Sequence, residues 1–161
     1  MDIRPVEPAD LPALVDLACT VFGPFYLDSF RPVVGETVFA NRHGDWKGDY
    51  QRHLAGVHDP ANGKFAVVAL ADGQVAGFAG WAVQESERHG EIDILAVHPA
   101  HRRLGLGRAL LEHALDQIKA VGAVEMISIG TGGDDFHAPA RALYESFGFT
   151  PFPQVTYTRA I

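Results

Sequence analysis

The chain has 161 residues, of which 47% are hydrophobic and 20% charged, with a formal net charge of −7, and this balance predicts one globular domain spanning 1–161. The acidic charge disfavours a nucleic-acid binder, and no apolar run approaches the roughly 20 residues of a membrane span. A single cysteine, Cys19, and an N-terminus without a secretory signal favour the cytoplasm.

The expected elements begin with a strand at 3–6 and a helix over 11–22, for which Asp10 is the expected N-cap. Two β-rich runs flank Asp72-Gly73, a pair typical of a type I′ hairpin turn. The other expected elements are a helix at 46–54, a strand at 91–97, a helix after the glycines near 105, a strand at 124–131, a helix at 139–147 that ends at Gly148, and a strand at 154–161. This order predicts an α/β domain with a mixed sheet.

The junction HPAHRRLGLGRAL (98–110) concentrates positive charge in an acidic chain. Its glycines allow a sharp turn, and the N–H groups and dipole of the following helix form an anion site. The arginines and glycines concerned are Arg102, Arg103, Gly105, Gly107 and Arg108. These features predict a phosphate-rich ligand, but Leu110 breaks the dinucleotide pattern G-x-G-x-x-G, and no P-loop pattern occurs.

Two short motifs stand out in the sequence. Val97-His98-Pro99 is followed by Arg102-x-x-Gly105-x-Gly107 between a strand and a helix, and ALYESFGF lies at 142–149. Both resemble motifs of the GNAT superfamily of acyl-CoA N-acyltransferases, and the second is similar to the family signature A-L-Y-x-x-x-G-F. The resemblance implies the GNAT fold, a mixed central sheet of about six to seven strands flanked by about four helices. It also implies acetyl-CoA as cosubstrate, with no metal.

The resemblance implies where the cofactor binds. The backbone of 95–97 would pair with the pantetheine arm, and the N–H groups of 103–108 would hold the pyrophosphate. His137 stands where the family often has Asn, and it can also donate a hydrogen bond to the cofactor. The expected cofactor-binding residues are Leu95, Ala96, Val97, Arg102, Arg103, Leu104, Gly105, Leu106, Gly107, Arg108 and His137.

Acyl transfer to an amine needs a proton acceptor for the ammonium, stabilisation of an oxyanion and a proton donor for the thiolate. Glu91 occupies the position where many GNAT members place a general base, and Asp93 lies two residues on, on the same face as 95 and 97. Asp93 and His137 are the alternative bases. Tyr144, in the second motif, is the expected proton donor, and backbone N–H groups near 95–97 are expected to meet the oxyanion.

The expected function is therefore acetyl transfer from acetyl-CoA to a primary amine by direct attack in a ternary complex. No well-placed Cys or Ser supports a covalent acyl-enzyme, and no acidic or cysteine partner completes a metal site with His98 and His101. A small-molecule amine is the favoured acceptor, selected largely by 23–63. The alternatives are a protein or peptide amine, or a non-catalytic CoA-binding sensor. We expect no nucleic-acid or membrane partner, and a monomer or homodimer.

Overall fold

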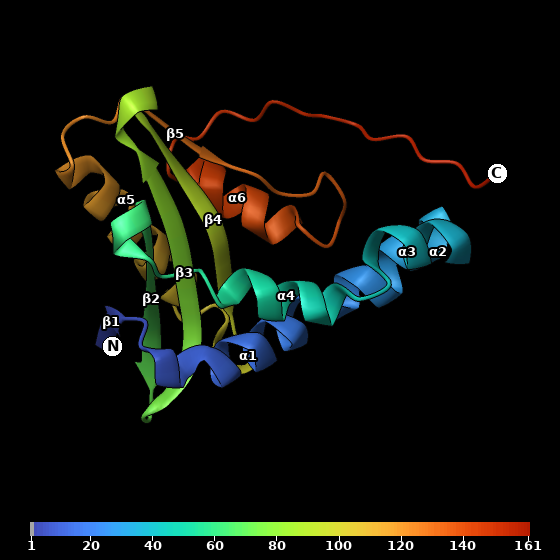
Figure 1. Cartoon of the computed structure of the whole chain (residues 1–161), viewed down its shortest axis with the longest axis horizontal. Helices are drawn as coiled ribbons and strands as arrows, with labels where there is room; N and C mark the ends of the chain where they lie inside the picture. The colour runs from blue at the N-terminus through green and yellow to red at the C-terminus, as the bar shows by residue number, and fades with distance from the viewer. Residues whose placement is uncertain (1) are drawn as a thin grey trace. The chain divides into compact units, whose positions relative to one another are not determined.

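A computed structural model of the chain describes residues 2–161 (Figure 1). Its residues form two compact units, one comprising the chain up to Val21 together with Lys47–Ile129, the other comprising Phe22–Trp46 and Gly130–Ile161. The strands are β1 (Asp2–Pro5), β2 (Lys64–Ala71), β3 (Gln74–Gln84), β4 (His89–Val97) and β5 (Met126–Ile129). The helices are α1 (Leu11–Pro24), α2 (Arg31–Val34), α3 (Glu36–His43), α4 (Trp46–Leu54), α5 (Leu106–Ala120) and α6 (Ala138–Ser146), with a π-helical segment, Phe25–Phe30, between α1 and α2.

The first unit is built on a mixed sheet of five strands in the order β1-β2-β3-β4-β5. The first three pairings are antiparallel and the pairing of β4 with β5 is parallel. The β2–β3 hairpin turns through Asp72 (φ 50°) and Gly73 (φ 75°), and two successive positive φ angles are what a type I′ turn requires. The predicted α/β class, mixed sheet and hairpin are therefore confirmed.

The predicted strand at 154–161 is wrong, and the described sheet has five strands rather than six to seven. Residues 150–161 form neither helix nor strand, and all of them are exposed. Their alternating side chains have high strand propensity, but a strand becomes stable only when its backbone pairs with a neighbour and one face is buried. The segment has neither in the structure, and Tyr157 is 91% exposed.

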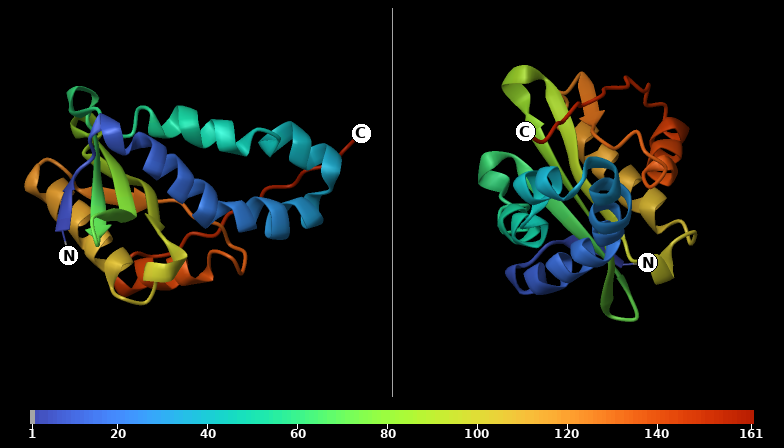
Figure 2. Two further views of the ribbon diagram at one scale, coloured as in Figure 1. Left: turned by 90° about the horizontal axis from the view of Figure 1, so that it is seen from below. Right: turned by 90° about the vertical axis from the view of Figure 1, so that its right-hand side faces the viewer.

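Helix α5 packs on one face of the sheet, while α4 and the part of α1 up to Val21 lie on the opposite face (Figure 2). Two glycines allow α5 to approach closely. A Cβ added at Gly77 would lie 3.0 Å from Leu110 Cδ1, and one added at Gly90 would lie 2.6 Å from Ile118 Cγ2. Five side chains along this helix are buried in the core: Leu110, Leu111, Ala114, Leu115 and Ile118.

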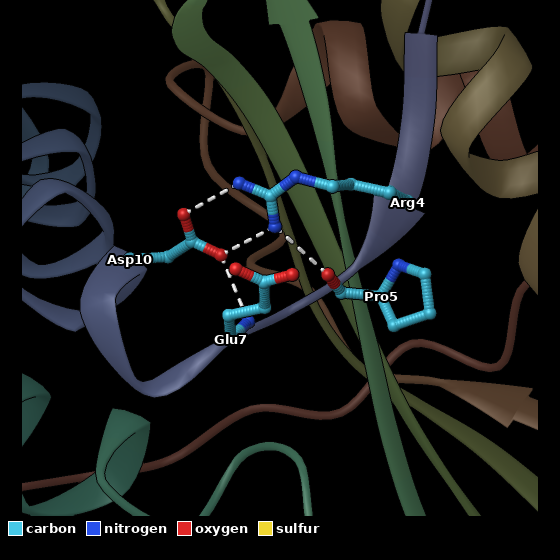
Figure 3. A network of polar contacts seen from close by, with 4 residues as sticks. All are labelled: Arg4, Pro5, Glu7 and Asp10. Carbon is cyan, nitrogen blue, oxygen red and sulfur yellow. Dashed lines mark hydrogen bonds and ion pairs between the residues drawn. The ribbon is translucent and has the colours of Figure 1, made fainter.

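A network around Asp10 connects β1 to the start of α1 (Figure 3). The Asp10 carboxylate accepts two hydrogen bonds from the Arg4 guanidinium, at 2.7 and 2.8 Å, and a third from the backbone N–H of Glu7 at 2.8 Å. Asp10 is thus the last residue of the short turn Pro8–Asp10, and its carboxylate accepts a hydrogen bond from the N–H of Glu7, which precedes that turn, and not from the N–H groups of α1. The prediction that Asp10 caps the helix that follows is therefore corrected.

The Asp10 network predicts a dependence of stability on acid. The hydrogen bonds from Arg4 hold the pKa of the Asp10 carboxyl below its usual range. The stabilisation is therefore complete above the unfolded value of about 3.9 and is lost as the pH falls through the lowered folded value. We expect Asp10→Asn to unfold more easily at neutral pH and to lose less stability on acidification. Urea unfolding between about pH 2.5 and about pH 7 measures this, and identical slopes for both proteins would contradict it.

One helical run among the described residues, Pro8–Val34, is long and apolar enough to cross a membrane by length and composition alone. No unbroken apolar sequence runs through it, because Asp16 and Asp28 interrupt it. Its Leu14 and Ala18 side chains are fully buried in the first unit. A core helix of a globular protein passes the same test, so the run is weak support for a membrane span.

Candidate cofactor and catalytic site

The glycine turn after β4 has the backbone geometry of an anion site. The chain passes through the short turn Pro99–His101 and then through two left-handed residues, Arg103 (φ 64°) and Gly105 (φ 80°). Gly105 directly precedes α5 and provides no side-chain cap for it. The N–H groups of the first helical turn lack intrahelical partners, and together with the helix dipole they favour an anion there.

The cofactor residues predicted on this turn lie together in the first unit. Arg102, Arg103 and Arg108 are all exposed, and the Nε of Arg102 donates to the carbonyl oxygen of Val97 at 3.4 Å. Leu104 is also exposed, whereas Leu106 is buried in the core. The turn therefore gathers positive charge around exposed backbone, while the Leu106 side chain belongs to the core.

The outer edge of β4 is open next to this turn. β5 pairs with β4 only from His89 to Ile92. Over 93–97 no described strand lies on that side of β4, although the predicted pantetheine contact, 95–97, falls within this stretch. Backbone groups on an unpaired strand edge are available to a ligand that lies alongside as an added strand.

A bulge in β4 marks the point where β5 separates from it. On β3, Gly80 lies opposite Ile94 and Trp81 lies opposite Ile92, so Asp93 has no residue opposite it. An extra residue of this kind bends the strand and changes which face the later side chains occupy. Nothing in the sequence pattern indicated where this would happen.

The bulge divides the predicted residues of β4 between two faces. Residues directly opposite each other in antiparallel strands have their side chains on the same face of the sheet. Val97 lies opposite Gly77, and a Cβ added at Gly77 would contact side chains of α5. Leu95 and Val97 therefore face α5. Glu91 and Asp93 lie on the other face, which α4 covers. The hydrogen bond between Asp93 and His53 of α4 is consistent with this placement. The prediction that all four residues share one face is wrong, because strict alternation does not hold across the extra residue.

Asp93 has a partner that the sequence did not suggest. Its Oδ2 lies 2.7 Å from Nε2 of His53, on α4, and both side chains are partly exposed. The hydrogen bond to Asp93 raises the pKa of the His53 imidazole above its ordinary value. No local motif marks His53, since its partner lies 40 residues along the chain. Glu91 is exposed on the same strand.

Tyr144 and His137 belong to the second unit. Tyr144 lies on α6 with its ring 6.4 Å from that of Phe149, and burial raises the pKa of its phenol. The helix ends as predicted, with Gly148 in the left-handed region at φ 84°. The phenol therefore keeps its proton throughout the physiological pH range.

His137 is held by a carboxylate and by aromatic rings of the same unit. Its Nδ1 makes a short hydrogen bond to Oδ1 of Asp134, and its ring lies edge-on to Phe25 at 4.8 Å and to Phe136 at 4.9 Å. Arg141 holds this loop by donating to the carbonyl oxygens of Gly132 and Asp134, both at 2.6 Å. His137 is thus fixed in place, and its role stays a prediction.

The histidines at the glycine turn contact each other and nearby backbone. The rings of His98 and His101 have centroids 5.8 Å apart, and Nδ1 of His98 accepts a hydrogen bond from the N–H of Ala100 at 3.2 Å. Within residues 2–161, no three or more His, Cys, Asp or Glu side chains are grouped to hold a metal ion.

Comparison with known proteins gives matches of sequence and of structure. The model of the acetyltransferase (GNAT) family matches residues 26–149. The chain is 44% identical over 71 residues to the mycothiol acetyltransferase of Beutenbergia cavernae. This aligned region covers 44% of this chain and 23% of that protein. The matched regions span less than half the length of the first curated relatives.

Solved structures resemble the chain over nearly its whole length. The ribosomal-protein-S18-alanine N-acetyltransferase from Escherichia coli is 25% identical with a TM-score of 0.67, over 94% of this chain and 79% of that one. An aminoglycoside N-acetyltransferase in complex with CoA is 16% identical with a TM-score of 0.63, over 99% of each chain. At that identity the second likeness concerns the fold alone.

Proposed function

Because the chain belongs to the GNAT acetyltransferase family, we propose that it is an acetyl-CoA-dependent N-acetyltransferase. The observation that carries the proposal is the junction of β4 and α5. A basic, left-handed turn leads into a helix N-terminus there, beside a strand edge that β5 leaves open past Ile92. A ligand with a diphosphate joined to an amide-containing arm suits both features, and CoA is such a ligand.

The proposed cofactor contacts are those that the family resemblance implies, and the geometry of the turn and of the strand edge supports them. The backbone of 95–97 pairs with the pantetheine arm, and the N–H groups of 103–108 hold the pyrophosphate with the three arginines around it. Leu106 contributes only its backbone, because its side chain is buried. His137 is proposed as a further contact on the strength of the family resemblance. The acetyl-CoA assignment is supported by the CoA complex of a protein with the same fold.

The proposed chemistry is direct attack of an amine on the thioester. Glu91, exposed on β4, accepts the proton of the acceptor ammonium, whose pKa is near ~10 if it is lysine-like. The amine nitrogen bonds to the acetyl carbon and the C–S bond breaks. On the strength of the family resemblance, Tyr144 gives its proton to the departing thiolate, and backbone N–H groups of β4 stabilise the oxyanion. The nitrogen releases its second proton to solvent, and the Tyr144 phenolate regains a proton from solvent. Asp93 and His137 are the alternative proton acceptors.

A small-molecule amine is the proposed acceptor. The carboxylates of Glu91 and Asp93 share a face of β4, and their charge suits a cationic amine. The names of the similar proteins cover mycothiol, aminoglycosides and a ribosomal-protein alanine, so a protein amine is the second candidate. We propose in addition that residues 1–161 form a single domain, that the protein is a monomer or homodimer, and that it is located in the cytoplasm.

The first test is CoA release from acetyl-CoA with a panel of amines. The panel contains kanamycin, spermidine, lysine, phenethylamine and a short peptide with a free N-terminus, and free thiol is measured as product. We expect turnover with at least one small amine. Turnover with the peptide alone would support the protein-amine alternative. Binding of CoA by calorimetry without any turnover would support the sensor, and absence of CoA binding would contradict the cofactor assignment.

Gly105→Ala tests the turn itself. At φ 80° an alanine side chain is strained by about 1–2 kcal/mol, so we expect lower stability and roughly tenfold weaker CoA binding as the turn relaxes. Gly148→Ala is the matched control, because Gly148 has φ 84° and, like Gly105, open space around an added Cβ, but it lies at the end of α6. Urea unfolding and calorimetry with CoA measure both effects. Equal CoA affinities of the two variants would contradict the proposed role of the turn.

A further inference from the structure

His53 has no part in the chemistry described above, and its partner Asp93 enters that chemistry only as an alternative proton acceptor and as a negative charge on β4. Asp93 is the extra residue of the β4 bulge, and its carboxylate is held at 2.7 Å by the imidazole of His53 from α4. The side chains of His53 and Asp93 are 46% and 36% exposed, so solvent and a solute can reach both. A charged pair that is neither buried nor central to the core is a weak contributor to stability.

The surrounding charges act on the titration of His53. On β4, Glu91 and His89 share the face of Asp93, and His89 is bonded to Ser128 at 2.7 Å. From β2, Lys64 disfavours a charged His53, but the hydrogen bond to Asp93 outweighs it and raises the pKa of the imidazole. On α4 itself, the remaining nearby charges include Asp49 and Arg52, which form their own ion pair at 2.5 Å.

We propose that Asp93 and His53 form part of the acceptor site, in which Asp93 attracts a cationic amine and His53 controls its charge. This inference rests on the proposed acetyltransferase function. When His53 is protonated, the pair is neutral and its carboxylate is occupied by the imidazolium. When His53 loses its proton, the pair carries one negative charge beside the open edge of β4, next to Glu91. The substrate class is thereby a cationic amine rather than an uncharged arylamine.

The consequence is a pH dependence of KM rather than of kcat. As the pH rises through the titration of His53, the pair gains negative charge and the KM for a cationic acceptor falls. The change expected for one partly exposed charge at contact distance is roughly fivefold. Asp93 acts on the substrate through its charge. Glutamine at position 53 can still donate a hydrogen bond to Asp93 but cannot gain or lose a proton. The His53→Gln substitution therefore removes only the pH dependence of KM.

The test measures kcat and KM at about pH 5.5 and about pH 8.5 with whichever of kanamycin and spermidine is acetylated faster in the panel. We expect His53→Gln to bind this amine about fivefold better than wild type at the lower pH and equally well at the higher pH, with similar kcat. We expect Asp93→Asn to raise KM about fivefold at the higher pH. His113→Gln, on α5, is the control, and thermal melting of each variant checks folding.

A gain of affinity at low pH separates this role from a structural one, because a variant that merely loosens α4 does not bind its substrate better. If the ratio of the KM of His53→Gln to the KM of wild type is the same at both pH values, the inference is overturned, while the proposed acetyltransferase function still stands. Loss of kcat instead of a change in KM would overturn it as well, since His53 would then be a proton acceptor. Absence of turnover with both kanamycin and spermidine would overturn this role, and absence of turnover with every amine of the panel would overturn the function as well.

Discussion

Glu91→Gln is expected to lower kcat/KM for acetyl transfer by roughly 10²–10⁴-fold while CoA affinity changes by less than about twofold. The amide keeps the size of the side chain and its place on β4 but cannot accept the proton of an ammonium. Glu91 is exposed and lies opposite Ala82 on β3, so the substitution disturbs no packing. Steady-state kinetics with the best amine of the panel, and calorimetry with CoA, measure the two quantities.

The pH profile of this variant gives a second check. If Glu91 removes the proton, raising the pH restores part of the rate, because more of the amine is then already unprotonated. Glu112→Gln, an exposed carboxylate on α5, is the matched control and is expected to behave as wild type. A Glu91→Gln enzyme with wild-type kinetics would transfer the role to Asp93 or His137, the two alternatives.

The sequence was a good guide to elements that local chemistry determines. The hairpin at Asp72-Gly73 and the helix at 46–54 were predicted with their correct positions, because turn residues and periodicity act within a few residues. The strand at 154–161 was wrong for the opposite reason. The alternation of polar and apolar side chains at 154–161 reflects only the propensity of these residues for strands. A strand also needs a partner strand elsewhere in the chain, and 150–161 has none in the described structure.

The same distinction applies to the candidate site. The glycine turn could be predicted, since glycines and arginines at fixed spacing determine backbone freedom and charge together. The bulge at Asp93 could not, because alternation of side chains assumes an unbroken register, and a one-residue slip leaves no signal in the local pattern. The partnership of His53 with Asp93 was missed for a related reason, since it depends on how α4 packs against the sheet.

Tyr144→Phe is expected to lower kcat by roughly 10²-fold or more while leaving CoA affinity nearly unchanged. The phenol is the predicted proton donor to the thiolate, and burial raises its pKa, so it stays protonated through the working range. Loss of the hydroxyl removes the proton donor but keeps the ring. The decline in rate caused by Tyr144 ionisation in wild type should accordingly lie above about pH 10.

This substitution separates a proton donor from a packing residue. Phenylalanine keeps the edge-on contact with Phe149, so the melting temperature should change little, whereas Tyr144→Leu would lose both the ring contact and the hydroxyl. If packing alone matters, Tyr144→Phe will have wild-type kcat and only Tyr144→Leu will be impaired. If the hydroxyl gives the proton, both variants will be slow, and only the leucine variant will also be less stable. Tyr157→Phe, in the exposed C-terminal segment, is the control for tyrosine substitution itself.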